Sequence, residues 1–356
     1  MINDCPHPWE GITINPQGYI TPCCMLPNKH AAHIDDVTSL TDTYVNHPFF
    51  IEYRNSIPKA CSYCYEQEAK GVWTAKNTTP LSGSYDKKIR YLEYTMSNLC
   101  NATCSMCGPY FSSSWVAHDK KYSVSTLSES AFKKILDVLP YVQHLVIKGG
   151  EPFLDKKNLI VLEKFLREST GRVDIITNGS LINEVCFDSR VHLAFSIDGT
   201  HDVYRWIRST DWDTVIDNAK KFYDATGKGV SVESCISLHN FFHVEEYYNF
   251  FIDAPYVMTI NQNHFADIPR KCSIHCLPDD ILMDQKDKNL RIIDKYKNNP
   301  KINSNNYLTM DSIKPRVDST GKCTKENAFK HIDYINGIRG FDLLDHVPEL
   351  KEWKGT

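Results

Sequence analysis

The sequence has no apolar run of 18 residues, no polybasic segment and no internal repeat. Without a long apolar run we expect no transmembrane helix. The formal charge of −4, from 40 basic and 44 acidic residues, gives no signature of a nucleic-acid or anionic-membrane partner. The N-terminal residues, MINDCPHPWEGITI, lack the basic start and apolar stretch of a signal peptide. We therefore expect a cytoplasmic protein that binds neither nucleic acid nor membrane.

Cysteine, in contrast, is abundant, with 13 residues in a chain of 356. In a protein without a secretion signal, clustered cysteines bind metal more often than they form disulfides. Eight fall in two groups, Cys5, Cys23, Cys24, Cys61 and Cys64 and then Cys100, Cys104 and Cys107, and five are scattered, Cys186, Cys235, Cys272, Cys276 and Cys323. The two groups predict metal sites. Among the scattered residues, Cys272, Cys276 and Cys323 allow a further site or are ordinary buried thiols, and Cys186 and Cys235 fit core positions.

The first 80 residues are irregular, with prolines, glycines and cysteine pairs but little periodicity. Such a segment is typical of a small domain that metal holds together because its core is too thin to fold alone. The run TPLSGSYDKK, residues 79–88, reads as a linker. We therefore predict a separate cysteine-rich domain over residues 1–80.

From Ile89 onwards, strand-like runs alternate with amphipathic helical runs. The strand-like runs are IRYLEYTMS, HLVIKGG, RVDIITNG, VHLAFSIDG, GVSVESCISL and YVMTINQNHF. Six β–α units in series predict a parallel sheet with right-handed crossovers. Six are too few for an eight-stranded barrel, so we predict an α/β fold with a partial (β/α)6 TIM-like barrel over residues 86–270. A helical cap is predicted over residues 271–356.

Three cysteines follow the first predicted strand in the stretch CNATCSMCGPYF, which begins at Cys100. The carboxyl ends of parallel strands are where such folds place reactive groups. Three thiolates at this spacing can hold an iron–sulfur cluster and leave one iron open to a further ligand. The alternatives are a zinc site that a distant histidine completes, or unrelated buried thiols.

The second and third strands end in further candidates. In IKGGEPFL, Gly149 and Gly150 lack side chains where backbone must approach a ligand, and Glu151 supplies a carboxylate for an ammonium group. In IITNGS, Asn178 can hydrogen-bond hydroxyl groups. The alternative in both cases is an ordinary turn, since Gly-Gly and Asn-Gly are common turn sequences.

The fourth strand ends in FSIDG, where Ser196 and Asp198 alternate with Phe195 and Ile197 and so face the predicted site. Arg208 follows in YRWIRS. It is a candidate to hold an anion, with a solvated surface position as the alternative.

The C-x3-C-x2-C spacing of Cys100, Cys104 and Cys107 resembles the signature of the radical S-adenosylmethionine (SAM) superfamily. The resemblance implies a [4Fe–4S] cluster whose open iron binds the amino and carboxylate groups of SAM. One-electron reduction then cleaves a C–S bond and yields methionine and a 5′-deoxyadenosyl radical, which abstracts hydrogen. Met106 stands where the family often has an aromatic residue, and its backbone would contact adenine.

The later strand ends fit the same family in the expected order. GGE resembles the motif that holds the SAM amino group, and the segment around Asn178 lies where the family contacts ribose. The resemblance therefore implies cofactor contacts from Gly149, Gly150, Glu151, Asn178, Ser196 and Met106. It implies SAM or substrate contacts from Asp198, and we place Asp198 and Arg208 in the reacting site.

The N-terminal cysteines resemble a second motif. Cys5, Gly18 and Cys23 form C-x12-G-x4-C, similar to the opening of SPASM and twitch domains, which carry auxiliary [4Fe–4S] clusters in peptide-modifying radical SAM enzymes. Such domains usually follow the core, whereas here the motif precedes it. The predicted ligands are Cys5, Cys23, Cys61 and Cys64. Cys24 competes with Cys23, and a four-cysteine zinc ribbon is the alternative reading.

Together these features predict a radical SAM enzyme of the oxidoreductase or maturase type. By resemblance its substrate is a peptide or protein side chain, and its electron donor is a flavodoxin or ferredoxin. Two alternatives stay open: the same radical chemistry on a small molecule such as a sugar, and a non-enzymatic zinc-binding interaction protein.

Overall fold

The computed structural model describes residues 5–26, 31–56, 59–71, 74, 76, 88–266, 269–315 and 323–356. The predicted linker at 79–88 lies almost entirely outside these residues. The chain divides into two compact units. Unit 1 comprises Met1–Asn101, Pro109–Thr177 and Ile182–Leu193, and unit 2 comprises Ala102–Gly108, Asn178–Leu181 and Ala194–Thr356.

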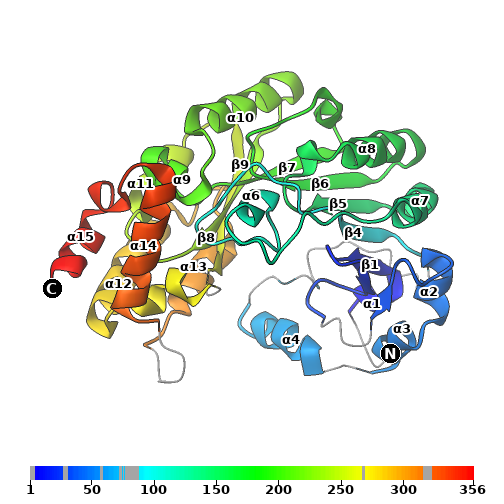
Figure 1. Cartoon of the computed structure of the whole chain (residues 1–356), viewed down its shortest axis with the longest axis horizontal. Helices are drawn as coiled ribbons and strands as arrows, with labels where there is room; N and C mark the ends of the chain where they lie inside the picture. The colour runs from blue at the N-terminus through cyan, green and yellow to red at the C-terminus, as the bar shows by residue number, and fades with distance from the viewer. Residues whose placement is uncertain are drawn as a thin grey trace. The chain divides into compact units, whose positions relative to one another are not determined.

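Unit 1 contains the N-terminal segment and the first three of the predicted strands (Figure 1). Its strands are β1 (Gly11–Ile14), β2 (Tyr19–Thr21), β3 (Ala32–His33), β4 (Tyr91–Thr95), β5 (His144–Lys148) and β6 (Arg172–Thr177). Its α-helices are α1 (His7–Glu10), α2 (Leu40–Asn46), α3 (Pro48–Asn55), α4 (Ser62–Glu68), α6 (Ser113–Val116), α7 (Glu129–Val138) and α8 (Lys156–Glu168). Its 3-10 helices are η2 (Lys59–Cys61), η3 (Leu139–Tyr141), η4 (Pro152–Leu154) and η5 (Glu184–Phe187).

The strands of unit 1 pair in the order β3-β2-β1-β4-β5-β6. The pairs β1–β4, β4–β5 and β5–β6 are parallel, and β1–β2 and β2–β3 are antiparallel. The N-terminal segment therefore extends the edge of the sheet, with Gly11 beside Tyr91 and Ile14 beside Tyr94. We expected an irregular segment instead. These strands have only two to four residues, too short to show a period of two.

The helices that cover the predicted strands begin at side-chain caps. The hydroxyl oxygen of Ser128 accepts a hydrogen bond from the backbone N–H of Ala131 at the start of α7. The carboxylate of Asp155 does the same for the N–H of Lys157 at the start of α8. Such caps satisfy donors that have no partner within the helix. They are among the amphipathic helical runs expected between the strands, and their apolar faces bury residues such as Ile135 and Phe165.

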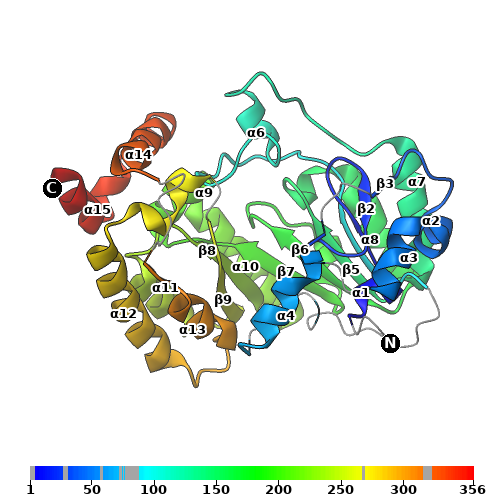
Figure 2. The same cartoon turned by 90° about the horizontal axis from the view of Figure 1, so that it is seen from below.

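Unit 2 contains the later strands and the C-terminal helices (Figure 2). Its strands are β7 (Val191–Ser196, which begins in unit 1), β8 (Val230–Ile236) and β9 (Val257–Phe265). Its α-helices are α9 (His201–Arg208), α10 (Trp212–Thr226), α11 (Val244–Phe251), α12 (Asp279–Tyr296), α13 (Ser304–Asp311), α14 (Lys325–Arg339) and α15 (Pro348–Gly355). Its 3-10 helices are η6 (Arg270–Cys272), η7 (Ile274–Cys276) and η8 (Leu343–Asp345).

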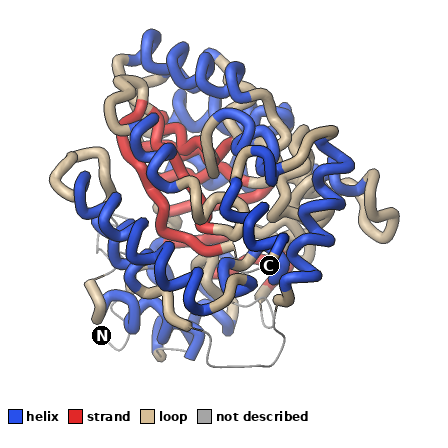
Figure 3. Tube along the Cα trace, turned by 90° about the vertical axis from the view of Figure 1, so that its left-hand side faces the viewer, coloured by secondary structure: helices blue, strands red, loops and turns tan. Residues whose placement is uncertain are grey.

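The strands β7, β8 and β9 are parallel and adjacent in chain order. All six strand-like runs predicted from Ile89 onwards are therefore strands, and Figure 3 shows them in red among the blue helices. The α/β class with a parallel sheet and a helical C-terminus is confirmed, and strands paired in chain order suit a partial barrel. Among the described residues, no helix is both long enough and apolar enough to cross a membrane.

Candidate functional site

The loop after β4 carries the three predicted cluster cysteines. In unit 1, the backbone N–H of Cys100 donates to the hydroxyl oxygen of Ser113 at 3.0 Å, and the hydroxyl of Ser114 donates to the carbonyl of Cys100 at 2.7 Å. Both serines lie in α6, the short helix that follows the loop. Two side chains of α6 thus fix the backbone of the first cysteine.

The other two cysteines belong to unit 2 and form a turn. The backbone N–H of Cys107 donates to the carbonyl of Cys104 at 3.0 Å, with Ser105 and Met106 between them. The Cys104 thiol is buried, with 7% of the residue exposed. Its sulfur lies 3.6 Å from the carbonyl oxygen of Arg208 and 3.8 Å from the Nη1 of the same residue. The guanidinium of Arg208 therefore lies beside the sulfur of one predicted cluster ligand.

The Gly-Gly-Glu segment follows β5 in unit 1 and packs against the residues that precede Cys100. The backbone N–H of Gly150 donates to the carbonyl of Ser97 at 3.1 Å, and that of Glu151 donates to the carbonyl of Leu99 at 2.6 Å. A Cβ atom on residue 150 would lie 2.1 Å from the carbonyl oxygen of Leu99, and Gly149 has φ +150°. Only glycine tolerates these positions.

Glu151 is 1% exposed and directs its carboxylate toward the end of β6. The hydroxyl of Thr177, the last residue of β6, donates to Oε1 of Glu151 at 2.7 Å. The backbone N–H of Phe153 donates to the same oxygen at 3.2 Å. These hydrogen bonds stabilise the carboxylate, because a buried carboxylate without donors is costly to hold in its charged form.

Two more predicted residues lie at strand ends in unit 2. The side-chain oxygen of Asn178 accepts from the backbone N–H of Ser180 at 2.9 Å and from its hydroxyl at 2.6 Å. It therefore closes the turn that was the alternative reading of this position. Ser196 is the last residue of β7, half-buried, and is paired in register with Glu233 of β8.

Asp198 and Arg208 form a buried ion pair. The Nε of Arg208 donates to Oδ2 of Asp198. The side chain of Arg208 is 14% exposed and that of Asp198 is 0% exposed. The backbone N–H of Cys235 donates to the other carboxylate oxygen at 2.7 Å. Burial alone would lower the pKa of Arg208, but Asp198 and Cys104 hold it well above its ordinary value. The guanidinium stays charged between the carboxylate and the cysteine sulfur.

The variant Arg208→Gln is expected to lower the free energy of unfolding by about 3–5 kcal/mol, because it leaves the Asp198 carboxylate buried and unpaired. The double variant Arg208→Gln/Asp198→Asn should recover part of this loss. Denaturant unfolding of the metal-free chain measures both. The control is Arg205→Gln, which removes partly exposed ion pairs with Asp202, Asp211 and Asp213 from the same helix and should cost less than about 1 kcal/mol. Equal losses for Arg208→Gln and Arg205→Gln would contradict the buried-pair description.

The N-terminal cysteines lie within unit 1 and influence one another. The pKa of the Cys5 thiol is raised to about 12, mainly by burial and to a smaller extent by Cys61 and Cys64. Burial also raises the pKa of Cys23 well above its ordinary value, and Cys24, Cys5 and Cys61 contribute. The four predicted auxiliary ligands are thus close enough to interact, as a shared metal site requires.

Cys24 has different surroundings. Burial raises the pKa of its thiol to about 11, and the next cause is the carboxylate of Glu93, which forms an ion pair with Lys148. Of the other predicted cysteines, only Cys64 acts on it among the main causes. Cys24 is also exposed, whereas Cys23 is half-buried.

The remaining cysteines do not form the further metal site that we considered. Cys276 and Cys323 form a disulfide across 47 residues of sequence. Cys272 is fully buried, and its Sγ donates to the carbonyl of Ser105 at 3.6 Å. Cys186 is buried in unit 1, as expected for a core position.

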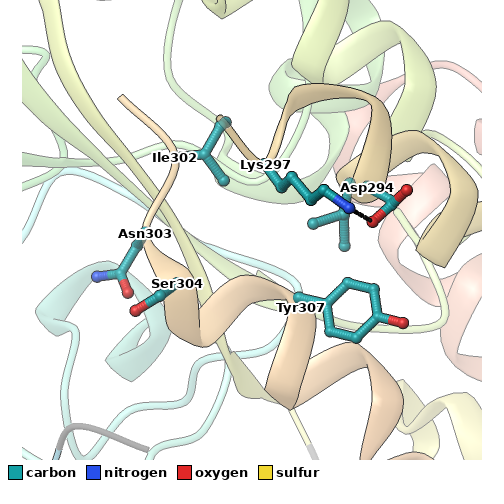
Figure 4. A pocket seen from close by; sticks show the side chains of 7 residues that line it. Asp294, Lys297, Ile302, Asn303, Ser304 and Tyr307 are labelled. Atoms are coloured by element: carbon teal, nitrogen blue, oxygen red, sulfur yellow. Dashed lines mark hydrogen bonds and ion pairs between the residues drawn. The ribbon is translucent and has the colours of Figure 1, made fainter. Parts of the chain in front are cut away.

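A surface hollow of about 410 Å³ lies elsewhere in unit 2, between the C-terminal part of α12 and the start of α13 (Figure 4). Its lining includes Lys297 and Asp294, which form an ion pair at 2.7 Å, and the ring of Tyr307. The Lys297 ammonium is thus already paired within the hollow. None of the predicted site residues lines it.

The donor sets fit iron–sulfur clusters. The loop after β4 offers three cysteines within eight residues, with Arg208 beside one sulfur. The N-terminal segment offers four interacting thiols, a complete ligand set. Burial raises the pKa of the Cys5, Cys23 and Cys61 thiols, and metal binding at these residues would release their protons.

Two family models match the chain. Residues 94–251 match the radical SAM superfamily, and residues 5–65 match the SPASM iron–sulfur cluster-binding domain. A curated relative, the GTP 3′,8-cyclase of Peptoclostridium acidaminophilum, is 28% identical over 110 residues, which are 30% of this chain and 33% of that protein. The chain thus spans about a third of the length of the curated relative that it matches.

Similar solved structures are more distant. Streptococcus suis SuiB bound to the precursor peptide SuiA has a TM-score of 0.46 and 14% identity, covering 82% of this chain and 70% of that one. The anSMEcpe protein with bound AdoMet has a TM-score of 0.38 and 19% identity, covering 48% of this chain and 51% of that one.

The order of the two matched domains agrees with the order of the cysteine groups in the sequence. A radical SAM domain uses a [4Fe–4S] cluster and SAM, and a SPASM domain adds an auxiliary iron–sulfur cluster. Residues 94–251 therefore form a radical SAM domain, and residues 5–65, which precede it, form a SPASM iron–sulfur cluster-binding domain.

Proposed function

We propose that this protein is a radical SAM oxidoreductase of the maturase type, in which Cys100, Cys104 and Cys107 hold the catalytic cluster. The observation that carries the proposal is the match of residues 94–251 to the superfamily, within which these cysteines and Glu151 fall. When bound and reduced, the cluster supplies the electron that cleaves SAM and generates the 5′-deoxyadenosyl radical. The chain's own residues bind and orient the reactants.

Glu151 is assigned to the SAM ammonium group, because it is a buried carboxylate after β5 that accepts hydrogen bonds from Thr177 and Phe153. Arg208 is assigned to an anionic group of SAM or substrate, and Asp198 orients it. Gly149 and Gly150 let the Glu151 backbone approach the chain before Cys100. Further cofactor contacts are assigned to Met106, Asn178 and Ser196.

The auxiliary cluster is assigned to Cys5, Cys23, Cys61 and Cys64. The variant Cys23→Ala is expected to lower the iron content by about four atoms per chain, because a [4Fe–4S] cluster takes four thiolates. The matched variant Cys24→Ala should keep the wild-type content of about eight. Anaerobic iron and sulfide analysis after reconstitution measures both. If Cys24→Ala loses the iron and Cys23→Ala keeps it, the assignment is reversed.

The substrate class we propose is a peptide or protein side chain, with a flavodoxin or ferredoxin as the electron donor. The support is the SPASM match at residues 5–65, since the domain is typical of peptide-modifying members of the superfamily. The similarity to a GTP 3′,8-cyclase favours a small molecule as the second candidate.

The proposed function is tested by anaerobic incubation of the reconstituted protein with SAM and dithionite, followed by a search for 5′-deoxyadenosine. Formation of this product above a cluster-free control is the expected result. Mass spectrometry of peptides encoded beside the gene, and of nucleotide and sugar substrates, then separates the two substrate classes. A colourless protein that binds zinc without inorganic sulfide would overturn the proposal.

A further inference from the structure

The helix α14 lies outside both matched domains, which end at residues 65 and 251. Thr324 caps its start, and Gly340, with φ 78°, ends it. Two polar residues on this helix, His331 and Arg339, lie eight positions apart and so share a face. Both reach the loop of unit 2 that contains Cys104.

Arg339 forms hydrogen bonds with Thr103, the residue just before Cys104. Its Nη1 donates to the hydroxyl of Thr103 at 2.9 Å, and its Nη2 donates to the carbonyl of the same residue. Its Nε donates to the carbonyl of Trp206 at 2.9 Å. The fork of a guanidinium makes these three bonds at once, which a lysine cannot do. The Arg339 charge also interacts with the Cys104 thiol.

His331 forms a hydrogen bond with the backbone of Ser105, the residue just after Cys104. Its Nε2 lies 2.8 Å from the carbonyl oxygen of Ser105, and since a carbonyl only accepts, this nitrogen carries the proton. Burial lowers the pKa of His331 to about 4, so the ring is neutral at pH 7. Cys272 donates to the same carbonyl, and the ring of His239 contacts the Ser105 hydroxyl at 3.2 Å.

The side chains of His239, Cys272 and His331 also form a group whose potential metal ligand atoms lie within 4.8 Å of one another. A tetrahedral zinc site would bring such atoms to about 3.3–3.6 Å. All three side chains contact Ser105, which accounts for their grouping. Hydrogen bonding to the loop is therefore the role that the contacts support.

We propose that α14 is a positioning element for the catalytic cluster, in which Arg339 and His331 fix Thr103 and Ser105 on either side of Cys104. The proposal rests on the proposed function, which makes Cys104 a cluster ligand. Fixing both neighbours holds the Cys104 sulfur in place, and the Arg339 charge stabilises the extra electron of the reduced cluster. Without these contacts the cluster would be released faster and would be harder to reduce.

The test compares Arg339→Gln and His331→Phe with the wild type, as full-length, anaerobically reconstituted proteins. Lys330→Gln is the control, because Lys330 lies on the same helix in an exposed ion pair with Glu326. The rate of iron loss to a chelator is followed together with an EPR redox titration. The catalytic cluster is identified by the signal that changes when SAM is added.

Arg339→Gln is expected to release the iron of the SAM-responsive cluster about tenfold faster than the wild type, as the loss of two or more hydrogen bonds implies. The midpoint potential of this cluster should become more negative in Arg339→Gln. His331→Phe should change the iron-release rate and the midpoint potential in the same directions, but by smaller amounts. The auxiliary cluster should not change, whereas general unfolding would release both. Arg339→Lys, which keeps the charge, should restore most of the potential if Arg339→Gln folds poorly.

Wild-type release rates and potentials in folded Arg339→Gln and His331→Phe would overturn the proposal. The proposal would also be overturned if the wild-type chain bound one zinc ion and His331→Phe lost it, since His239, Cys272 and His331 would then form a metal site. A wild type without any SAM-responsive cluster would instead reject the proposed function itself.

Discussion

Replacing Cys100, Cys104 and Cys107 together by alanine is expected to abolish reductive cleavage of SAM. The three thiolates are the proposed ligands of the catalytic cluster, and a cluster that loses all of them cannot stay in the loop. The iron content should fall by about four atoms per chain, while the auxiliary cluster remains. Anaerobic assay of 5′-deoxyadenosine under dithionite, with iron and sulfide analysis of the same sample, measures both effects.

The control for this experiment is Cys186→Ala, which removes a buried thiol of unit 1 that lies outside both cysteine groups. Cys186→Ala should lose some stability, because removal of the buried sulfur leaves a small cavity. The variant should keep its iron and its activity. If the triple variant still produced 5′-deoxyadenosine, the ligands of the catalytic cluster would have to lie among the other cysteines.

The part of the fold that follows Ile89 could be predicted because its signals are local. Each strand from β4 to β9 is a short run that contains β-branched or aromatic residues, and capping residues such as Ser128 and Asp155 mark the helices between them. The carboxyl end of a strand is known as soon as the strand is known. The candidate residues at those ends, such as Glu151 and Asp198, followed from this without any knowledge of pairing.

The features that could not be predicted join residues far apart in the sequence. Arg339 and Thr103 are 236 positions apart, and His331 and Ser105 are 226 apart. A pattern of apolar and polar residues shows which face of a helix is buried but not which partner lies there. The same limit applies to the pairing of β1 with β4 and to the disulfide between Cys276 and Cys323.

The ion pair of Asp198 and Arg208 shows both sides of this limit. Each residue was predicted as part of the site from its place at or beyond the end of β7. That they bind one another, and that Arg208 also reaches the sulfur of Cys104, depends on how α9 turns back toward the loop. The sequence therefore names Asp198 and Arg208 as candidates, whereas the contact between them is visible only in the structure.

The variant Glu151→Gln is expected to weaken SAM binding by about 10- to 100-fold, since hydrogen bonds to charged groups contribute about 1.5–3 kcal/mol. Glutamine keeps the size of the side chain but removes the charge that the SAM ammonium group requires. Anaerobic binding titrations, followed by the EPR change of the reduced cluster, measure the dissociation constant. The iron content should stay at the wild-type value, because Glu151 is not a proposed cluster ligand.

Two variants sharpen the result. Thr177→Val removes the hydroxyl that donates to Glu151 at 2.7 Å and should weaken SAM binding by about 3- to 10-fold, because the carboxylate loses this hydrogen bond. Glu129→Gln removes an exposed carboxylate of unit 1 that pairs with Lys157 and should have no effect. If Glu151→Gln bound SAM as tightly as Glu129→Gln, the ammonium group would have to be held elsewhere, and Glu151 would serve the fold of its turn alone.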